Sequence, residues 1–362
     1  MNIGVVGCGD ISPLYLRSAK EFPVLKVLAC ADLDMGAARS RAAEFGIQAL
    51  SVDEILNHPD IDIILNITVP SAHAAVARAA LAAGKHVYNE KPLATDLADA
   101  KDLLALADEK GLRVAGAPSS FLGAAVQTCR KLVDEGAIGL PVAFHTSLLG
   151  HGMEGWHPNP EFFYRPGGGP LLDVGPYIVA ALTALLGPVA RVSGMARASF
   201  PERTITAGPR AGTVFPVTTP THIVCTLEFV GGAIGTLTTS FDVWASEQPK
   251  FELYGSTGTL RLAAPNLFGG PVWVHAAGGV WEEKPLVHPY TSLETGWSIA
   301  LADFALATEE GRPHRADGRF ALHALEVMQA CLRSAETGEA VAVESRCERP
   351  EPLWPGVAGG LW

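Results

Sequence analysis

The stretch GVVGCGDIS occupies residues 4–12 and connects a short apolar strand to a predicted helix. Gly7 allows the tight turn between them, and Gly9 lets the backbone approach a pyrophosphate group. Ser12 stands where a small residue lets the helix pack closely against the sheet. The helix N-terminus then offers backbone N–H groups and the positive end of its dipole to phosphates. This stretch therefore predicts a dinucleotide-binding turn.

An acidic residue, Asp32, follows the second predicted strand, residues 24–31. Its carboxylate could accept hydrogen bonds from both hydroxyls of an adenosine ribose and would repel a 2′-phosphate. NAD is therefore favoured as the cofactor, with NADP left open. The alternative is a glycine turn followed by a solvated aspartate, with no ligand. The combination of strand, turn, helix and acidic residue favours the nucleotide site.

Strand and helix signals alternate along residues 1–122, which is typical of a doubly wound parallel sheet. Continuous apolar runs such as 24–31 indicate strands covered on both faces. The sequence therefore predicts an α/β fold with an N-terminal Rossmann domain over residues 1–122. Strands are expected over 2–6, 24–31, 61–67, 85–89 and 112–115, and helices from the glycine turn to about 21 and over 35–45, 71–83 and 95–110.

Residues 123–362 have a different pattern and are predicted to form a C-terminal α+β domain for substrate binding and oligomerisation. Period-two alternation over 221–229 and 234–240 indicates an open, largely antiparallel sheet with one semi-polar face. That face is either solvated or the interface of a homodimer or homotetramer, and its length and mixed polarity favour the interface. Helices are expected over 122–135, 293–310 and 320–336, and loops over 150–170 and 201–220.

The composition excludes several classes of protein. Of the 362 residues, 48% are hydrophobic and 18% charged, which provides for sizeable cores and argues against a disordered chain. A net charge of −11 without any Lys/Arg-rich run argues against nucleic acid as a partner. The six scattered cysteines contain no Cys-x-x-Cys pair and indicate reduced thiols in a cytoplasmic protein. No secretory signal or membrane span is recognisable, so a soluble protein is expected.

The tripeptide Glu90-Lys91-Pro92 directly follows the predicted strand 85–89. It places an amine at the carboxyl end of a strand, where open α/β sheets bind their ligands. Another strand end leads through Thr68 and Pro70 into a helix that Ser71 is expected to cap, with His73 in its first turn. Either this loop closes over the cofactor near the nicotinamide, or the helix is simply capped and His73 is incidental. The candidate cofactor-binding residues are Gly7, Gly9, Asp10, Ile11, Asp32, Thr68, Pro70, His73, Glu90 and Lys91.

Together these features resemble the glucose–fructose oxidoreductase/inositol dehydrogenase (Gfo/Idh/MocA) family. The resemblance implies a Rossmann domain, a C-terminal α/β domain with an open sheet, and NAD(P)-linked hydride transfer on a sugar, polyol or sugar-derivative hydroxyl or carbonyl. The motifs that carry it span nearly the whole chain. They are the glycine turn, Asp32, Pro70-x-x-His73, Ala82-Ala83-Gly84-Lys85-His86-Val87, Glu90-Lys91-Pro92 and Gly167-Gly168-Gly169-Pro170-Leu171-Leu172-Asp173-Val174-Gly175-Pro176-Tyr177.

In that family the lysine of the Glu-Lys-Pro motif works with an aspartate and, four residues later, commonly a histidine. The resemblance therefore implies Lys91, Asp173 and Tyr177 as the catalytic residues, in a branch with tyrosine in place of the histidine. A position that is commonly acidic in the family is Ala180 here. On a helix, Asp173 and Tyr177 share one face at i and i+4.

The expected chemistry of these side chains is proton transfer. Beside an oxidised nicotinamide, Lys91 should have a lowered pKa, and a neighbouring ammonium should shift Tyr177 toward the phenolate. Either group could then take a hydroxyl proton, while Asp173 orients the substrate hydroxyl or Lys91. The structural alternatives are helix N-terminal stabilisation by Asp173 and a buried core ring for Tyr177.

The predicted loop 150–170 is rich in Trp, Tyr, His and Glu, which stack on sugar faces and bind hydroxyl groups. A metal site at His145, His151, His157 and Glu154 is the alternative. Their spacing matches no compact ligand pattern, so no metal is expected. The candidate substrate-binding residues are Lys91, Phe121, Trp156, His157, Tyr164, Arg165, Asp173 and Tyr177.

Three other functions stay open at this point. The first is a reductase of imines or keto-sugars that uses NADPH or NADH. The second is NAD-dependent glycoside cleavage through transient 3-oxidation, and the third is a nucleotide-binding sensor that keeps the same fold. A sensor would have little reason to keep Lys91, Asp173 and Tyr177 together, so an enzyme is favoured.

Overall fold

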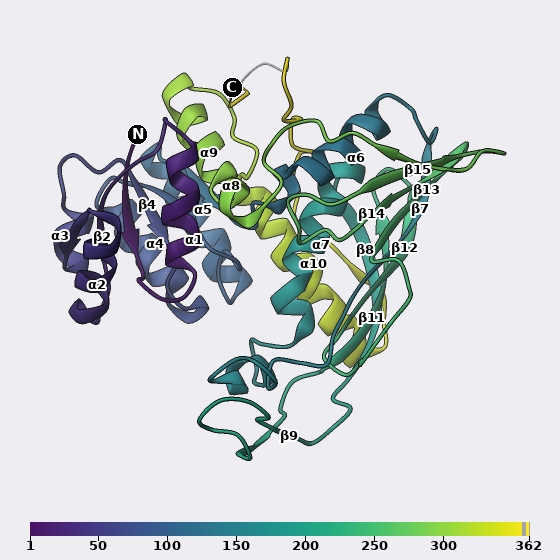
Figure 1. Ribbon diagram of the computed structural model, residues 1–362, viewed down its shortest axis with the longest axis horizontal. Coiled ribbons are helices and arrows are strands. Elements are labelled where there is room, and N and C mark those ends of the chain that lie inside the picture. Colours follow the sequence, from purple (N-terminus) through teal and green to yellow (C-terminus); the bar gives the residue numbers. More distant parts are fainter. Residues whose placement is uncertain (357–359, 362) are drawn as a thin grey trace.

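Two β-sheets with helices packed between and around them form the body of the protein (Figure 1). The computed structural model describes residues 1–356 and 360–361. Helix α10 (Gly318–Thr337) contacts elements of both sheets, so it links the two halves of the chain.

The first sheet has six parallel strands in the order β3-β2-β1-β4-β5-β6. Its central strands are buried because helices cover both faces, which explains their continuous apolar runs. This arrangement confirms the predicted Rossmann sheet. The strands are β1 (Asn2–Val6), β2 (Lys26–Ala31), β3 (Gln48–Leu50), β4 (Ile63–Asn66), β5 (His86–Asn89) and β6 (Val114–Gly116).

The helices of this half agree with the prediction except at two places. The short helix α3 and strand β3 were not predicted, because each is too brief to show a period. Ser71 does not cap a helix: it lies inside a 3-10 turn, η2 (Pro70–Ala72), because the fixed φ of Pro70 already starts helical backbone there. The helices are α1 (Ser12–Ser18), α2 (Met35–Phe45), α3 (Val52–Leu56), α4 (His73–Ala82) and α5 (Leu97–Lys110), with a further 3-10 turn η1 (Ala19–Glu21).

The second sheet has nine strands in the order β16-β15-β14-β13-β7-β12-β11-β8-β17. It is largely antiparallel, as predicted, and only β7 and β12 run parallel as neighbours. The strands are β7 (Pro141–Leu149), β8 (Val189–Arg197), β11 (His222–Phe229), β12 (Ile234–Ser240), β13 (Phe251–Gly255), β14 (Gly258–Leu262), β15 (Val272–Ala276), β16 (Trp281–Lys284) and β17 (Val341–Ala342).

Helices cover one face of this sheet and leave the other open (Figure 1). Helices α6 (Ala124–Asp134), α7 (Pro170–Leu186) and α10 lie on the side that faces the first sheet. In β11, buried and less buried residues alternate along the strand, which confirms the predicted two-faced pattern. Met195 and Ile234 are exposed on strands of this sheet.

The C-terminal helices return to the first sheet. The predicted helix 293–310 is divided into α8 (Leu293–Gly296) and α9 (Ile299–Glu310). Between them, the backbone N–H of Ser298 donates to Ser18 Oγ at 2.9 Å, and the Ser298 hydroxyl donates to the Tyr15 carbonyl at 3.0 Å. Helix α1 of the Rossmann half is therefore hydrogen-bonded to the segment between α8 and α9.

The two predicted loops contain short elements. The first holds the 3-10 helix η4 (Pro160–Tyr164), and the second holds the paired strands β9 (Glu202–Thr204) and β10 (Val214–Pro216). Another 3-10 turn, η3 (Ser120–Leu122), precedes α6. In the described part of the chain, none of the helices combines the length and the apolar character needed to cross a membrane.

Candidate functional site

The glycine turn between β1 and α1 is shaped by close backbone packing. Gly7 has a φ of +107°, and a Cβ placed on it would lie 2.7 Å from the Ile67 carbonyl oxygen, so only glycine fits. A Cβ placed on Gly9 would meet nothing within 4 Å, so its outer side is open to an approaching group. Ser12 is buried, and its hydroxyl donates to the Gly9 carbonyl at 2.7 Å. The turn is therefore packed against the sheet at Gly7 and has no neighbouring atoms on the outer side of Gly9.

Asp32 lies next to this turn, at the end of β2. One of its carboxylate oxygens accepts a hydrogen bond from the Cys8 amide at 2.7 Å, and the other accepts from the Asp34 amide at 2.9 Å. These bonds orient the carboxylate at the end of the strand and leave lone pairs for ribose hydroxyls. These groups fit an NAD nucleotide: the Asp32 carboxylate can accept hydrogen bonds from the ribose hydroxyls, and the open side of Gly9 leaves room for the pyrophosphate.

The loop after β4 is held by buried polar groups. The Thr68 hydroxyl donates to Asn66 Oδ1 at 2.7 Å, and Asn66 Nδ2 donates to Asn89 Oδ1 at 2.8 Å. His73 is buried, with its ring nitrogens 3.0 Å from the Thr68 carbonyl and 2.7 Å from the Pro92 carbonyl. It therefore ties the loops after β4 and β5 together, and its contact with the cofactor stays a prediction.

Lys91 brings the two halves of the site together. Its Nζ lies 3.0 Å from Asp173 Oδ1 and donates to the Asp173 carbonyl at 2.8 Å. The same nitrogen lies 5.4 Å from the centre of the Tyr177 ring. Asp173 stands in the first turn of α7, and Tyr177 follows one turn later on the same helix. The three residues predicted to act together are therefore adjacent.

The pKa values of these groups differ from the expectation. Burial opposes the charge of Lys91, but the neighbouring Tyr177, Asp173 and Glu90 outweigh it and raise the pKa of the ammonium above its ordinary value. Burial raises the pKa of Tyr177 to about 12, against the opposing effect of Lys91. The expected shift of Tyr177 toward the phenolate is thus wrong for the protein without a nucleotide, because loss of hydration exceeds the attraction of the ammonium.

Glu90 is engaged on the inner side of Lys91. One carboxylate oxygen accepts from the Tyr15 hydroxyl at 2.8 Å, and the other accepts from the backbone N–H of Lys91 at 2.7 Å. Tyr15 is completely buried, and burial raises the pKa of its hydroxyl well above the ordinary value, so it remains a donor. The carboxylate of Glu90 therefore positions the backbone of Lys91, and its contact with a cofactor stays a prediction.

Two family models match the chain. An oxidoreductase family model with an NAD-binding Rossmann fold (GFO_IDH_MocA) matches residues 1–117, and the GFO/IDH/MocA C-terminal domain model matches residues 126–261. The chain belongs to the GFO/IDH/MocA family of oxidoreductases. Membership confirms the resemblance seen in the sequence, together with the enzyme class and the NAD-binding Rossmann domain.

Relatives in this GFO/IDH/MocA family cover nearly the whole chain. It is 29% identical to the 1,5-anhydro-D-fructose reductase of Ensifer adhaerens, over 86% of this chain and 89% of that protein. It is 28% identical to the dTDP-3,4-didehydro-2,6-dideoxy-alpha-D-glucose 3-reductase of Streptomyces antibioticus, over 96% and 97% of the two chains. A solved levoglucosan dehydrogenase in complex with NADH and L-sorbose has a TM-score of 0.83 at 21% identity, over 95% of this chain and 99% of that one, which confirms the fold.

The predicted substrate-side residues divide into buried and exposed groups. Tyr164 is completely buried and donates its hydroxyl to Glu154, and Phe121 is completely buried against Phe320. Both side chains pack against core residues in this structure, and their contact with a substrate stays a prediction. Trp156 is 66% exposed and stands edge-on to His157.

Arg165 is exposed on the same loop as Trp156 and His157. It follows η4 and precedes the glycine-rich entry to α7, close in sequence to Asp173. Trp156, His157 and Arg165 are therefore the candidates on this loop whose side chains are at least partly exposed and open to contact with a substrate.

A buried ionic cluster that no sequence pattern predicted joins this loop to two other segments. Arg203 donates to Glu154 at 2.8 Å, to the Phe241 carbonyl at 2.9 Å and to Asp242. Its members come from three segments far apart in the chain: Glu154 and Arg203 from the two predicted loops, and Asp242 from a segment to which no element was assigned. No local pattern marked Arg203, and only its rarity in a Pro/Gly/Thr-rich segment could have drawn attention to it.

The histidines considered as metal ligands do not gather. His145 lies on β7 next to Thr236, His151 lies next to Arg203, and His157 contacts aromatic rings. Over residues 1–356 and 360–361, no group of three or more His, Cys, Asp or Glu side chains is arranged to hold a metal ion.

The two glycines of the turn should respond differently to alanine. Gly7→Ala forces a strained φ and a backbone contact, so we expect the free energy of unfolding to fall by about 1–3 kcal/mol. Gly9→Ala should leave stability within about 0.5 kcal/mol but weaken NADH binding about tenfold, because its methyl occupies the open side of the turn. Urea unfolding and NADH fluorescence titration measure the two effects. Equal stability of Gly7→Ala, or unchanged NADH affinity of Gly9→Ala, would contradict this account.

The hydroxyl of Tyr15 should matter for turnover through its bond to Glu90. Tyr15→Phe leaves one oxygen of a buried carboxylate without a donor, so the backbone at Lys91 loses its anchor. We expect kcat to fall about tenfold while the affinity for NADH is unchanged. Tyr254→Phe is the control, since the Tyr254 hydroxyl also donates to a carboxylate, that of Glu252 at 2.8 Å, but lies on β13 of the second sheet. A parallel loss in both variants would show a general packing defect instead.

Proposed function

We propose that this oxidoreductase transfers a hydride between NAD and a hydroxyl or carbonyl carbon of a sugar, polyol or sugar derivative. The observation that carries the proposal is the contact of Lys91 with Asp173 and Tyr177 at the carboxyl end of a Rossmann strand. The named relatives reduce an anhydrofructose and a dTDP-deoxysugar, which supports a carbohydrate as the substrate. Tyr177 then stands in the branch of the family that has tyrosine at the usual histidine position.

The bound nicotinamide supplies or accepts the hydride. Gly7, Gly9 and Asp32 would hold the nucleotide by the turn and the oriented carboxylate described above. Lys91 carries a proton at Nζ and can deliver it to the oxygen of a carbonyl that is being reduced. Asp173 keeps that ammonium in place, and the Tyr177 hydroxyl is a second proton donor on the same side.

The protonated state of Lys91 favours reduction in the resting protein. A raised pKa means that the amine enters the reaction as an acid, whereas oxidation needs it as a base. A keto-sugar reductase is therefore a specific second candidate, supported by the two reductases among the relatives. Cofactor preference between NAD and NADP follows from Asp32, which disfavours a 2′-phosphate.

The subunits are proposed to associate as a homodimer or homotetramer through the open face of the second sheet. Charged and aromatic side chains cross this sheet in register, since Glu252 pairs with Arg261 across β13 and β14 and Arg261 pairs with Trp273 across β14 and β15. The guanidinium of Arg261 lies 4.1 Å from the centre of the Trp281 ring.

A cytoplasmic location is proposed from the unpaired state of the described cysteines.

Removing the amine of Lys91 separates catalysis from nucleotide binding. Lys91→Ala should lower kcat by roughly 100- to 10,000-fold, because the proton donor that lies 3.0 Å from Asp173 is lost. NADH affinity should stay within about twofold, as the turn and Asp32 are untouched. Stopped-flow hydride transfer and NADH titration make the comparison, with the exposed Lys110→Ala as control. Unchanged turnover in Lys91→Ala would overturn the proposed role of Lys91, whereas NADH binding without turnover of any sugar by the unchanged protein would favour a sensor function.

The two reaction directions should differ in their pH dependence. Since the pKa of Lys91 is raised and that of Tyr177 is about 12, both groups hold their protons from about pH 6 to about pH 9. Reduction by NADH needs the proton, so its kcat/KM should be flat over that range. Oxidation needs the deprotonated form, whose fraction grows about tenfold per pH unit below the pKa, so its kcat/KM should rise with pH. A reduction rate that falls steadily from pH 6 would contradict this assignment.

A further inference from the structure

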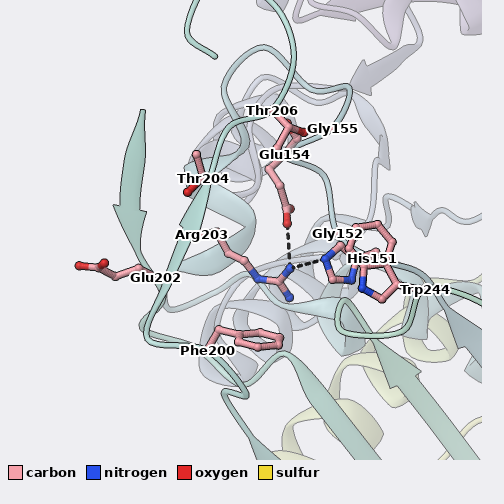
Figure 2. A pocket seen from close by; sticks show the side chains of 10 residues that line it. All are labelled: His151, Gly152, Glu154, Gly155, Phe200, Glu202, Arg203, Thr204, Thr206 and Trp244. Atoms are coloured by element: carbon pink, nitrogen blue, oxygen red, sulfur yellow. Dashed lines mark hydrogen bonds and ion pairs between the residues drawn. The ribbon is translucent and has the colours of Figure 1, made fainter. Parts of the chain in front are cut away.

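A cavity of about 490 Å³ lies on the loops that follow β7, β8 and β12 (Figure 2). None of its lining residues is Lys91, Asp173 or Tyr177. It therefore has walls of its own, built from residues far apart in the chain. Those that carry the argument are His151, Glu154, Phe200, Arg203 and Trp244.

Aromatic rings form two parts of the cavity wall. His151 stacks on Trp244 with ring centres 3.4 Å apart and planes 13° apart. Trp244 is nevertheless 83% exposed, so most of its indole faces solvent. Phe200 is 47% exposed and lies 4.9 Å from the guanidinium carbon of Arg203. Exposed rings beside a cavity offer flat apolar surfaces on which the C–H face of a sugar ring can stack.

The charges around the cavity sum to a negative value. Arg203 supplies one positive charge, and it is buried between two carboxylates, Glu154 and Asp242. Glu202 adds another carboxylate at the edge of the cavity. Burial and the neighbouring Arg203 lower the pKa of His151, so the imidazole is neutral near pH 7. A phosphate or carboxylate ligand would meet repulsion here.

Two buried hydrogen-bond donors on the lining residues lack partners within the described part of the chain. They are Nε of Arg203 and Nδ1 of His151. His151 Nε2 lies 3.3 Å from Arg203 Nη1, which can only donate, so the proton of the neutral imidazole is on Nδ1. Buried donors without acceptors are rare in folded proteins. Because the protein itself covers both nitrogens, they add no accessible donor to the cavity wall, and polar recognition falls to the carboxylates.

We propose that this cavity binds one ring of an uncharged saccharide. The stacking surfaces suit the C–H face of a sugar ring, and the excess of carboxylates favours hydroxyl groups, which can donate to them, over anionic groups. The volume lies within the range of about 300–1,000 Å³ that is usual for small-molecule sites. This proposal goes beyond the proposed function, because it concerns a binding site that shares no lining residue with the Lys91 site. Its test measures binding and not turnover, so the two can fail separately.

The test is isothermal titration of the full chain, saturated with NADH, with four uncharged probes: methyl β-D-glucopyranoside, cellobiose, maltose and levoglucosan. We expect at least one to bind, and its affinity to fall about tenfold in Trp244→Ala because the stacking surface is lost. Val230→Ala removes an exposed apolar side chain from the turn between β11 and β12, outside the cavity, and should leave that affinity unchanged. Glucose 6-phosphate should bind more weakly than the best uncharged probe.

Three results would overturn the proposal. One is that none of the four probes binds. Another is that Trp244→Ala binds the probes as well as the unchanged chain does. The third is that glucose 6-phosphate binds as tightly as the best uncharged probe. Sedimentation velocity on Trp244→Ala separates a further case, since a change of subunit number with probe binding intact would show that the exposed indole contacts a second copy instead.

Discussion

The ion pair between Lys91 and Asp173 is the contact on which the candidate site depends. Lys91 follows a strand of the first sheet, and Asp173 begins the helix that covers the second sheet. Their side chains are 19% and 20% exposed, a setting in which an ion pair adds little net stability. Its importance is therefore positional: it holds an ammonium and a carboxylate together, with the Tyr177 ring beside them, between the two halves of the chain.

Further contacts keep this pair in place. Glu90 accepts a hydrogen bond from the backbone N–H of Lys91 and another from the hydroxyl of the buried Tyr15. From the side, His73 joins the loop after β5 to the loop after β4. The end of the chain contributes too, since Ser298 bonds the backbone of Tyr15. The supporting groups around Lys91 thus come from widely separated segments, and each is buried enough for its hydrogen bonds to be geometrically specific.

The second sheet carries a different kind of polar cluster at the ends of its strands. Around Lys91 the negative charges keep a single ammonium protonated. Around Arg203 two carboxylates neutralise a guanidinium and leave an acidic surplus. The first arrangement prepares a proton for transfer, whereas the second presents carboxylates and aromatic faces without net positive charge. The two clusters therefore suit different parts of carbohydrate chemistry: reaction at one, recognition at the other.

The sequence by itself determined the Rossmann sheet, the glycine turn, Asp32 and Lys91. These features are local: each is a residue type at a strand end, and the strand order of a parallel sheet brings such ends together. The tertiary structure alone decided which polar and aromatic side chains are accessible. His73, Phe121 and Tyr164 have suitable chemistry but are buried, and Arg203 and Trp244 belong to a cavity assembled from distant loops. The pKa of Tyr177 was likewise beyond the sequence, because burial and charge act through space and not along the chain.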